Sequence, residues 1–154
     1  MSPCKQAVWD RRFLQLAEQV STWSKDPSTR CGSVVTNGRN NIVSLGFNGF
    51  PPGIEDKPEW LEDRSIKLKI VRHAEANALY HASFSRLPAK AIYVWPMPPC
   101  AQCASAIIQA GLQRIVTCRP DPSRAERWSD DWGLAEEMYL QAGIYLDYLA
   151  LPEG

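Results

Sequence analysis

Cysteine and histidine are the scarce side chains of this sequence that could carry chemistry. The first residues, MSPCK, contain no apolar signal segment, so we expect no secretory signal. An odd number of cysteines in such a chain favours a reducing compartment, where thiols serve metal binding or redox chemistry. Any soft-metal site must draw on five cysteines and two histidines, namely Cys4, Cys31, Cys100, Cys103, Cys118, His73 and His81.

Cys100 and Cys103 form a C-A-Q-C motif. The pattern predicts a helix that starts at this motif, directly after a strand. Residues three apart lie on nearly the same face of a helix, so both sulfur atoms can approach one ion. The positive end of the helix also favours thiolate over thiol.

His73 and Glu75 form an H-A-E motif that precedes a second predicted helix. Inside a helix, side chains two residues apart would point in different directions. We therefore expect His73 at the helix boundary and Glu75 facing the same cavity. One histidine and two cysteines make three ligands, and zinc sites with three protein ligands keep a fourth position for water. Zinc lowers the pKa of bound water from about 15.7 to about 7. Glu75 is then the candidate general acid and base that moves the proton of the water.

The other candidate ligands fit less well. His81 lies eight residues after His73, which is about 12 Å along a helix. Cys31 and Cys118 fall in predicted strands, where a small apolar packing role is expected. Two alternatives stay open at this point, because a C-x-x-C pair also occurs in redox modules and in structural zinc sites. The redox alternative leaves the H-A-E motif unexplained.

The elements that position these residues can be predicted from periodicity and turn chemistry. Asn37 to Asn40 form the predicted turn of a β-hairpin, and Gly111 and Gly143 end two helices. We expect loops over residues 48–58 and a polar connection over residues 120–128. We expect helices over residues 9–20, 73–83, 100–110 and 134–142, a partly helical segment over 60–71, and strands over 31–36, 41–47, 90–95, 113–118 and 144–149.

Strands that alternate with helices in the second half indicate parallel neighbours and one mixed sheet with helices on both faces. The length of 154 residues predicts a single domain over residues 1–154. No apolar run approaches the roughly 20 residues of a membrane span, so no membrane association is expected. Seventeen basic and seventeen acidic residues give zero net charge, and we therefore expect no stable nucleic-acid binding.

The combination H-x-E…P-C-x-x-C is the signature of zinc nucleobase deaminases. The further stretches SKDPST (24–29), GFNGFPPG (46–53), HAEANA (73–78) and PCAQC (99–103) accompany it. With these motifs the chain resembles the cytidine/deoxycytidylate deaminase superfamily, and most of all its deoxycytidylate (dCMP) deaminases, over about residues 10–147.

The resemblance implies a three-layer α/β/α fold of the cytidine-deaminase type with a five-stranded mixed sheet. It implies one Zn²⁺ per chain and hydrolysis of dCMP to dUMP and ammonia, which supplies dUMP for dTMP synthesis. It also implies a cytoplasmic homo-oligomer, a hexamer or a dimer, with dCTP and dTTP as allosteric effectors. Cytidine, a modified dCMP or a base in tRNA are the alternative substrates.

The resemblance also assigns roles to individual residues of this sequence. His73, Cys100 and Cys103 are the implied zinc ligands, and Glu75 is the implied proton shuttle. Asn48 is expected to hold the deoxyribose hydroxyl. Lys25, with Ser24, is expected to contact the 5′-phosphate, because a dianion favours a cation and hydrogen-bond donors near a loop.

Overall fold

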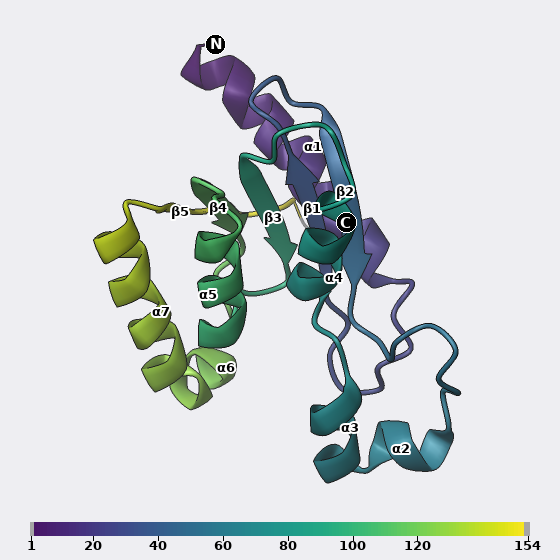
Figure 1. Cartoon of the computed structure of the whole chain (residues 1–154). Coiled ribbons are helices and arrows are strands. Elements are labelled where there is room, and N and C mark those ends of the chain that lie inside the picture. Colours follow the sequence, from purple (N-terminus) through teal and green to yellow (C-terminus); the bar gives the residue numbers. More distant parts are fainter. Residues whose placement is uncertain (1, 153–154) are drawn as a thin grey trace.

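A computed structural model describes residues 2–152 of the chain, and all its strands belong to one five-stranded sheet (Figure 1). The strand order is β2-β1-β3-β4-β5, where β1, β2 and β3 are antiparallel neighbours and β3, β4 and β5 are parallel. The sheet is therefore mixed, as predicted. The strands are β1 (Gly32–Thr36), β2 (Ile42–Phe47), β3 (Ala91–Trp95), β4 (Arg114–Thr117) and β5 (Tyr145–Tyr148).

Helices cover both faces of this sheet (Figure 1). Side chains of β3 alternate between the faces: Tyr93 packs with α1, whereas Ile92 and Val94 pack with the helices of the opposite face. The result is the three-layer α/β/α arrangement that the sequence predicts. The helices are α1 (Pro3–Ser21), α2 (Pro58–Glu62), α3 (Arg64–Ile70), α4 (Ala74–Ala82), α5 (Ala101–Gln109), α6 (Pro122–Arg127) and α7 (Ser129–Ala142).

The prediction of a polar connection over residues 120–128 was wrong, because α6 forms there. Asp121 caps this helix, since its Oδ1 accepts a hydrogen bond of 3.0 Å from the Arg124 amide, and Pro122 occupies the first turn. None of the α6 residues is buried. The segment therefore lacks the apolar periodicity on which helix prediction depends.

The packing of α4 on the sheet fixes the start of that helix. At Gly46 in β2 a side chain would collide with the backbone oxygen of Ala74 and the backbone nitrogen of Ala78. Ser33 and Ser44 also donate hydrogen bonds of 2.7 Å to the carbonyls of Ala74 and Ala78. The first turn of α4 is thus held directly against β1 and β2.

Within residues 2–152, no helix combines the length and the apolar character that crossing a bilayer requires.

Candidate metal centre

Two helix N-termini meet at the candidate centre. His73 is the N-cap residue of α4 and has extended backbone angles, so it lies at the helix boundary as predicted. Cys100 is the N-cap residue of α5, and Cys103 lies in the first turn of that helix. Asp131 from α7 accepts a hydrogen bond of 2.9 Å from the Ala101 amide. This bond ties the start of α5 to α7.

The three potential ligands form a compact cluster. The Nδ1 atom of His73 lies 3.3 Å from the Sγ atom of Cys103 and 3.6 Å from the Sγ atom of Cys100. All three donor atoms lie within 4.8 Å of one another. Tetrahedral zinc with ordinary bond lengths would place a sulfur and a nitrogen about 3.5 Å apart. The cluster therefore fits zinc in both spacing and donor type.

The protein environment favours an ionised sulfur in this cluster. Hydrogen bonding from Cys103 and His73 lowers the pKa of the Cys100 thiol to about 4, against the opposing effect of burial. The contact with Cys100, with burial next, raises the pKa of Cys103. Hydrogen bonding to Cys100 raises the pKa of His73. Thiolate is the form of cysteine that binds metals, so the site is prepared for a cation.

Glu75 lies in the first turn of α4 and is buried, with 6% of its surface exposed. Burial raises the pKa of its carboxyl, and the opposing contacts with Cys103 and His73 do not cancel that effect. Glu75, His73 and Cys100 line one cavity of about 390 Å³. A carboxyl with raised proton affinity beside the metal cluster can take up and release a proton.

Cationic side chains and aromatic rings also line this cavity. Trp128 and Trp132 stack with ring centroids 6.2 Å apart, and Trp132 donates a hydrogen bond of 3.2 Å to the Pro98 carbonyl. Four cationic side chains also line the cavity. They are Arg64, Lys67, Arg124 and Arg127.

The predicted substrate residues fall in different places. Asn48 is buried and lines the cavity. Its Oδ1 accepts a hydrogen bond of 2.8 Å from the Cys31 amide, and its Nδ2 donates one of 2.8 Å to the Thr29 carbonyl. Since an amide has two lone pairs and two N–H groups, Asn48 keeps one acceptor and one donor for a ligand.

Neither Ser24 nor Lys25 is among the residues that line the cavity. The buried Ser24 hydroxyl donates to the Asn48 carbonyl at 2.8 Å, so it supports the loop that carries Asn48. The Lys25 ammonium pairs with Asp56 at 2.7 Å, and 70% of the Lys25 side chain is exposed. Their phosphate role stays a prediction to which the geometry lends no support.

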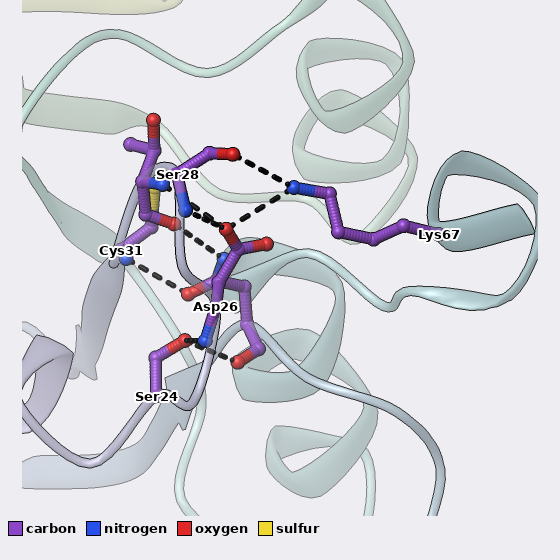
Figure 2. Close-up of polar contacts among 7 residues, drawn as sticks. Ser24, Asp26, Ser28, Cys31 and Lys67 are labelled. Carbon is purple, nitrogen blue, oxygen red and sulfur yellow. Dashed lines mark hydrogen bonds and ion pairs between the residues drawn. The ribbon is translucent and has the colours of Figure 1, made fainter. Parts of the chain in front are cut away.

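Sequence reasoning missed a buried ion pair in the cavity wall (Figure 2). The Lys67 ammonium lies 3.2 Å from Asp26 Oδ1 and 3.2 Å from Ser28 Oγ. Asp26 and Ser28 belong to the SKDPST motif, whereas Lys67 lies about 40 residues further on, in α3. The sequence carries no signal that separates the buried Lys67 from the exposed Lys69, because both lie one and three residues from the half-buried Ile66 and Ile70 of the same helix.

The remaining cysteines and the second histidine lie outside the metal cluster. Cys31 lines the cavity, and burial raises the pKa of its thiol. Cys118 packs at the edge of the apolar cluster beneath α1. His81 lies at the far end of α4, where its Nδ1 is 3.3 Å from the Leu45 carbonyl.

Comparison with known proteins agrees with this geometry. A family model, the cytidine and deoxycytidylate deaminase zinc-binding region, matches residues 7–119. An uncharacterized deaminase from the luxG 3′ region of Aliivibrio fischeri is 38% identical over 144 residues, which cover 93% of this chain and 95% of that protein. The deoxycytidylate deaminase of Homo sapiens is 34% identical over 141 residues, which cover 88% of this chain and 76% of that protein.

The fold also matches a solved structure. The dCMP deaminase of cyanophage S-TIM5, in complex with dCMP and dUMP, superposes with a TM-score of 0.71 and 21% identity. The match covers 97% of this chain and 99% of that one.

Fold, metal cluster and adjoining carboxyl together define a zinc-dependent hydrolytic deaminase. Within that class, the family match and the two relatives show that the chain belongs to the cytidine and deoxycytidylate deaminase family. The resemblance predicted from the motifs is thus confirmed.

Proposed function

We propose that residues 1–154 act as one deaminase domain that converts dCMP and water to dUMP and ammonia. The observation that carries this proposal is the buried Glu75 beside the cluster of His73, Cys100 and Cys103, in a cavity that also presents cations. The cations favour a nucleotide over an uncharged nucleoside. Deoxycytidylate deaminases among the relatives support the same substrate.

The donor set of His73, Cys100 and Cys103 would hold the zinc ion. Zinc in a site with three protein ligands supplies a Lewis acid that makes water a nucleophile at neutral pH.

Glu75 performs the proton transfers in this proposal. Its carboxylate takes a proton from the attacking water, whose oxygen bonds to C4 of the cytosine ring. The carboxyl then returns that proton to N3 of the ring. It next carries the second proton of the former water from the new C4 hydroxyl to the amino nitrogen, so that the bond between C4 and the amino group breaks, ammonia leaves and the C4 carbonyl of dUMP remains. Burial of Glu75 raises its proton affinity, which suits a group that must hold a proton between two transfers.

Asn48 serves in the proposal as the group that orients the sugar. Its hydrogen bonds to the Cys31 amide and the Thr29 carbonyl hold the side chain in one orientation at the cavity wall. The free donor and acceptor of its amide match a deoxyribose hydroxyl, which both donates and accepts.

The proposal extends to the setting of the enzyme. Family resemblance supports a cytoplasmic homo-oligomer whose activity responds to dCTP and dTTP. Sedimentation of the zinc-loaded protein tests the assembly, and initial deamination rates with and without each nucleotide test the response. A monomeric protein whose deamination rate is the same with and without dCTP or dTTP would contradict this part of the proposal.

A substrate panel tests the central claim. Zinc-loaded protein is incubated with equal concentrations of dCMP, cytidine, 5-methyl-dCMP and a tRNA, and ammonia release is measured. We expect the highest kcat/KM with dCMP. A higher kcat/KM with any of the other three would identify that compound, and not dCMP, as the substrate.

A further inference from the structure

Lys67 is an unusual lysine, because it is buried in the wall of the active-site cavity with 6% of its surface exposed. Its ammonium contacts Asp26 Oδ1 and Ser28 Oγ, each at 3.2 Å (Figure 2). A lysine ammonium has three N–H donors. Two are used in these contacts, and the third has no acceptor among residues 2–152.

The neighbours of Lys67 offer further donors to the same place. The Ser28 hydroxyl accepts from Lys67, so its own proton stays available for a ligand. Asp26 Oδ1 already accepts from Lys67 and from the amides of Ser28 and Thr29, at 2.8 and 3.0 Å. One oxygen of the Asp26 carboxylate is therefore engaged by the protein itself.

Arg124 from α6 completes this wall. It lines the main cavity and also a smaller adjoining hollow, and Asp26, Ser28 and Thr29 line both as well. The Nε atom of Arg124 lies 3.4 Å from Asp121 Oδ2. The two terminal nitrogens of the guanidinium remain as donors, in the fork geometry that suits phosphate.

We propose that Lys67, oriented by Asp26 and Ser28 and assisted by Arg124, is the residue that selects a phosphorylated substrate. The proposal rests on the proposed deaminase function and names the residues that recognise the phosphate. A phosphate dianion would accept hydrogen bonds from the ammonium, the hydroxyl and the guanidinium. A nucleoside without phosphate would leave these donors unpaired in the cavity wall.

A purely structural role for Lys67 makes a different prediction. Within residues 2–152, α2 and α3 pack against each other and against no other helix or strand. The ion pair of Lys67 and Asp26 thus also fastens α3 to the body of the protein. Loss of this attachment of α3 would lower the activity on phosphorylated and unphosphorylated substrates alike. Loss of a phosphate contact would lower only the activity on phosphorylated substrates.

The experiment compares kcat/KM for dCMP and for deoxycytidine in zinc-loaded wild type, Lys67→Met, Asp26→Asn and Arg124→Gln. Lys69→Met is the matched control, because Lys69 lies on the same helix and is exposed. We expect Lys67→Met to lower the value for dCMP about 10–100-fold, as for a lost charged hydrogen bond, with less than a threefold change for deoxycytidine. Asp26→Asn should keep the preference for dCMP.

Arg124→Gln should move the preference in the same direction as Lys67→Met, and it tests the proposal even if Lys67→Met does not fold. The proposal would be overturned if kcat/KM fell equally for dCMP and deoxycytidine in both Lys67→Met and Asp26→Asn. It would also be overturned if the ratio of the two kcat/KM values stayed unchanged in Lys67→Met and Arg124→Gln.

A binding measurement separates this proposal from the proposed function. Calorimetry with dUMP, deoxyuridine and inorganic phosphate needs no turnover. If the wild type deaminates neither substrate, the proposed function fails. The phosphate assignment still holds if dUMP binds more tightly than deoxyuridine and Lys67→Met removes that difference, and it fails if the difference persists. Inorganic phosphate that binds as tightly as dUMP would show a site for the free ion and would also overturn the assignment.

Discussion

Asp10 and Arg114 are joined by two parallel hydrogen bonds although 104 residues separate them. The two terminal nitrogens of Arg114 lie 2.8 and 2.7 Å from the two carboxylate oxygens of Asp10. The Tyr93 hydroxyl donates a third bond of 2.7 Å to Asp10 Oδ1. Asp10 therefore links α1 to β3 and β4 on the face of the sheet that is remote from the metal cluster.

The first prediction concerns this link. Asp10→Asn should lower the free energy of unfolding by about 1–3 kcal/mol, because charged hydrogen bonds to Arg114 are lost. Asp147→Asn is the control, since Asp147 also bonds Arg114, at 2.7 Å, but its side chain is 52% exposed. The control should change stability by less than about 1 kcal/mol. Urea unfolding measures both, and equal effects would contradict the prediction.

The acid stability of the protein should depend on the same residue. Burial acts to raise the pKa of Asp10, but the hydrogen bonds from Arg114, Gln6 and Tyr93 outweigh it, so that the pKa lies below the ordinary 3.8. A lowered pKa means that the contribution is present above pH 3.8 and is lost as the pH falls through the folded value. The difference in unfolding free energy between wild type and Asp10→Asn should therefore stay constant from pH 7 to 5 and shrink below pH 4.

The second prediction separates catalysis from metal binding at Glu75. Glu75→Gln keeps the shape of the side chain but cannot transfer protons, so kcat should fall about 10²–10⁴-fold. Bound zinc, measured by elemental analysis, should stay at one per chain. A variant that keeps more than a tenth of the wild-type kcat would remove Glu75 from the proton-transfer role.

The third prediction concerns the ligand cluster. Cys103→Ala should lose most of its zinc and all measurable deaminase activity, because two ligands hold the metal far less tightly than three. Cys118→Ala is the control, since Cys118 is partly buried and lies outside the cluster. It should retain zinc. Chelation of the wild type should abolish activity reversibly, and recovery on addition of zinc would complete the test.

The fourth prediction contrasts two glycines. Gly46→Ala should destabilise the protein by about 2–4 kcal/mol and lower activity, because the new methyl group would push α4 and its N-cap residue His73 away from β2. Gly133→Ala in α7 meets nothing within 4 Å, and it should stabilise by about 0.5–1 kcal/mol through helix propensity. The midpoint of thermal unfolding should therefore fall in Gly46→Ala and rise in Gly133→Ala.

Each half of the cluster was predictable because its geometry is local, whereas the meeting of His73 with Cys100 and Cys103, 27 and 30 residues further on, was predicted from the deaminase signature. Cys100 and Cys103 share one helical turn, and His73 precedes Glu75 at the start of another. Motif spacing carries that information without knowledge of the tertiary structure. The β-hairpin of β1 and β2 was predictable for the same reason, since Asn37 to Asn40 supply turn chemistry between two apolar runs.

The cationic wall was not predictable in this way. Lys67 meets Asp26 across 41 residues of sequence, and the order of the chain does not mark that contact. Lys25 stands beside Asp26 in the motif and was predicted to bind phosphate, yet the chain turns its side chain toward Asp56. Arg124 lies on α6, a helix without an apolar stripe. The sequence pattern therefore predicted neither this helix nor the position of Arg124 in the cavity wall.

The segment formed by α2 and α3 should be the least protected part of the chain. Its backbone hydrogen bonds lie within two short helices, and side chains rather than strands attach it to the rest. Amide deuterium uptake over residues 58–70 should therefore proceed by local opening, at a free energy well below that of global unfolding. A protease should cleave first in this segment while the sheet stays intact.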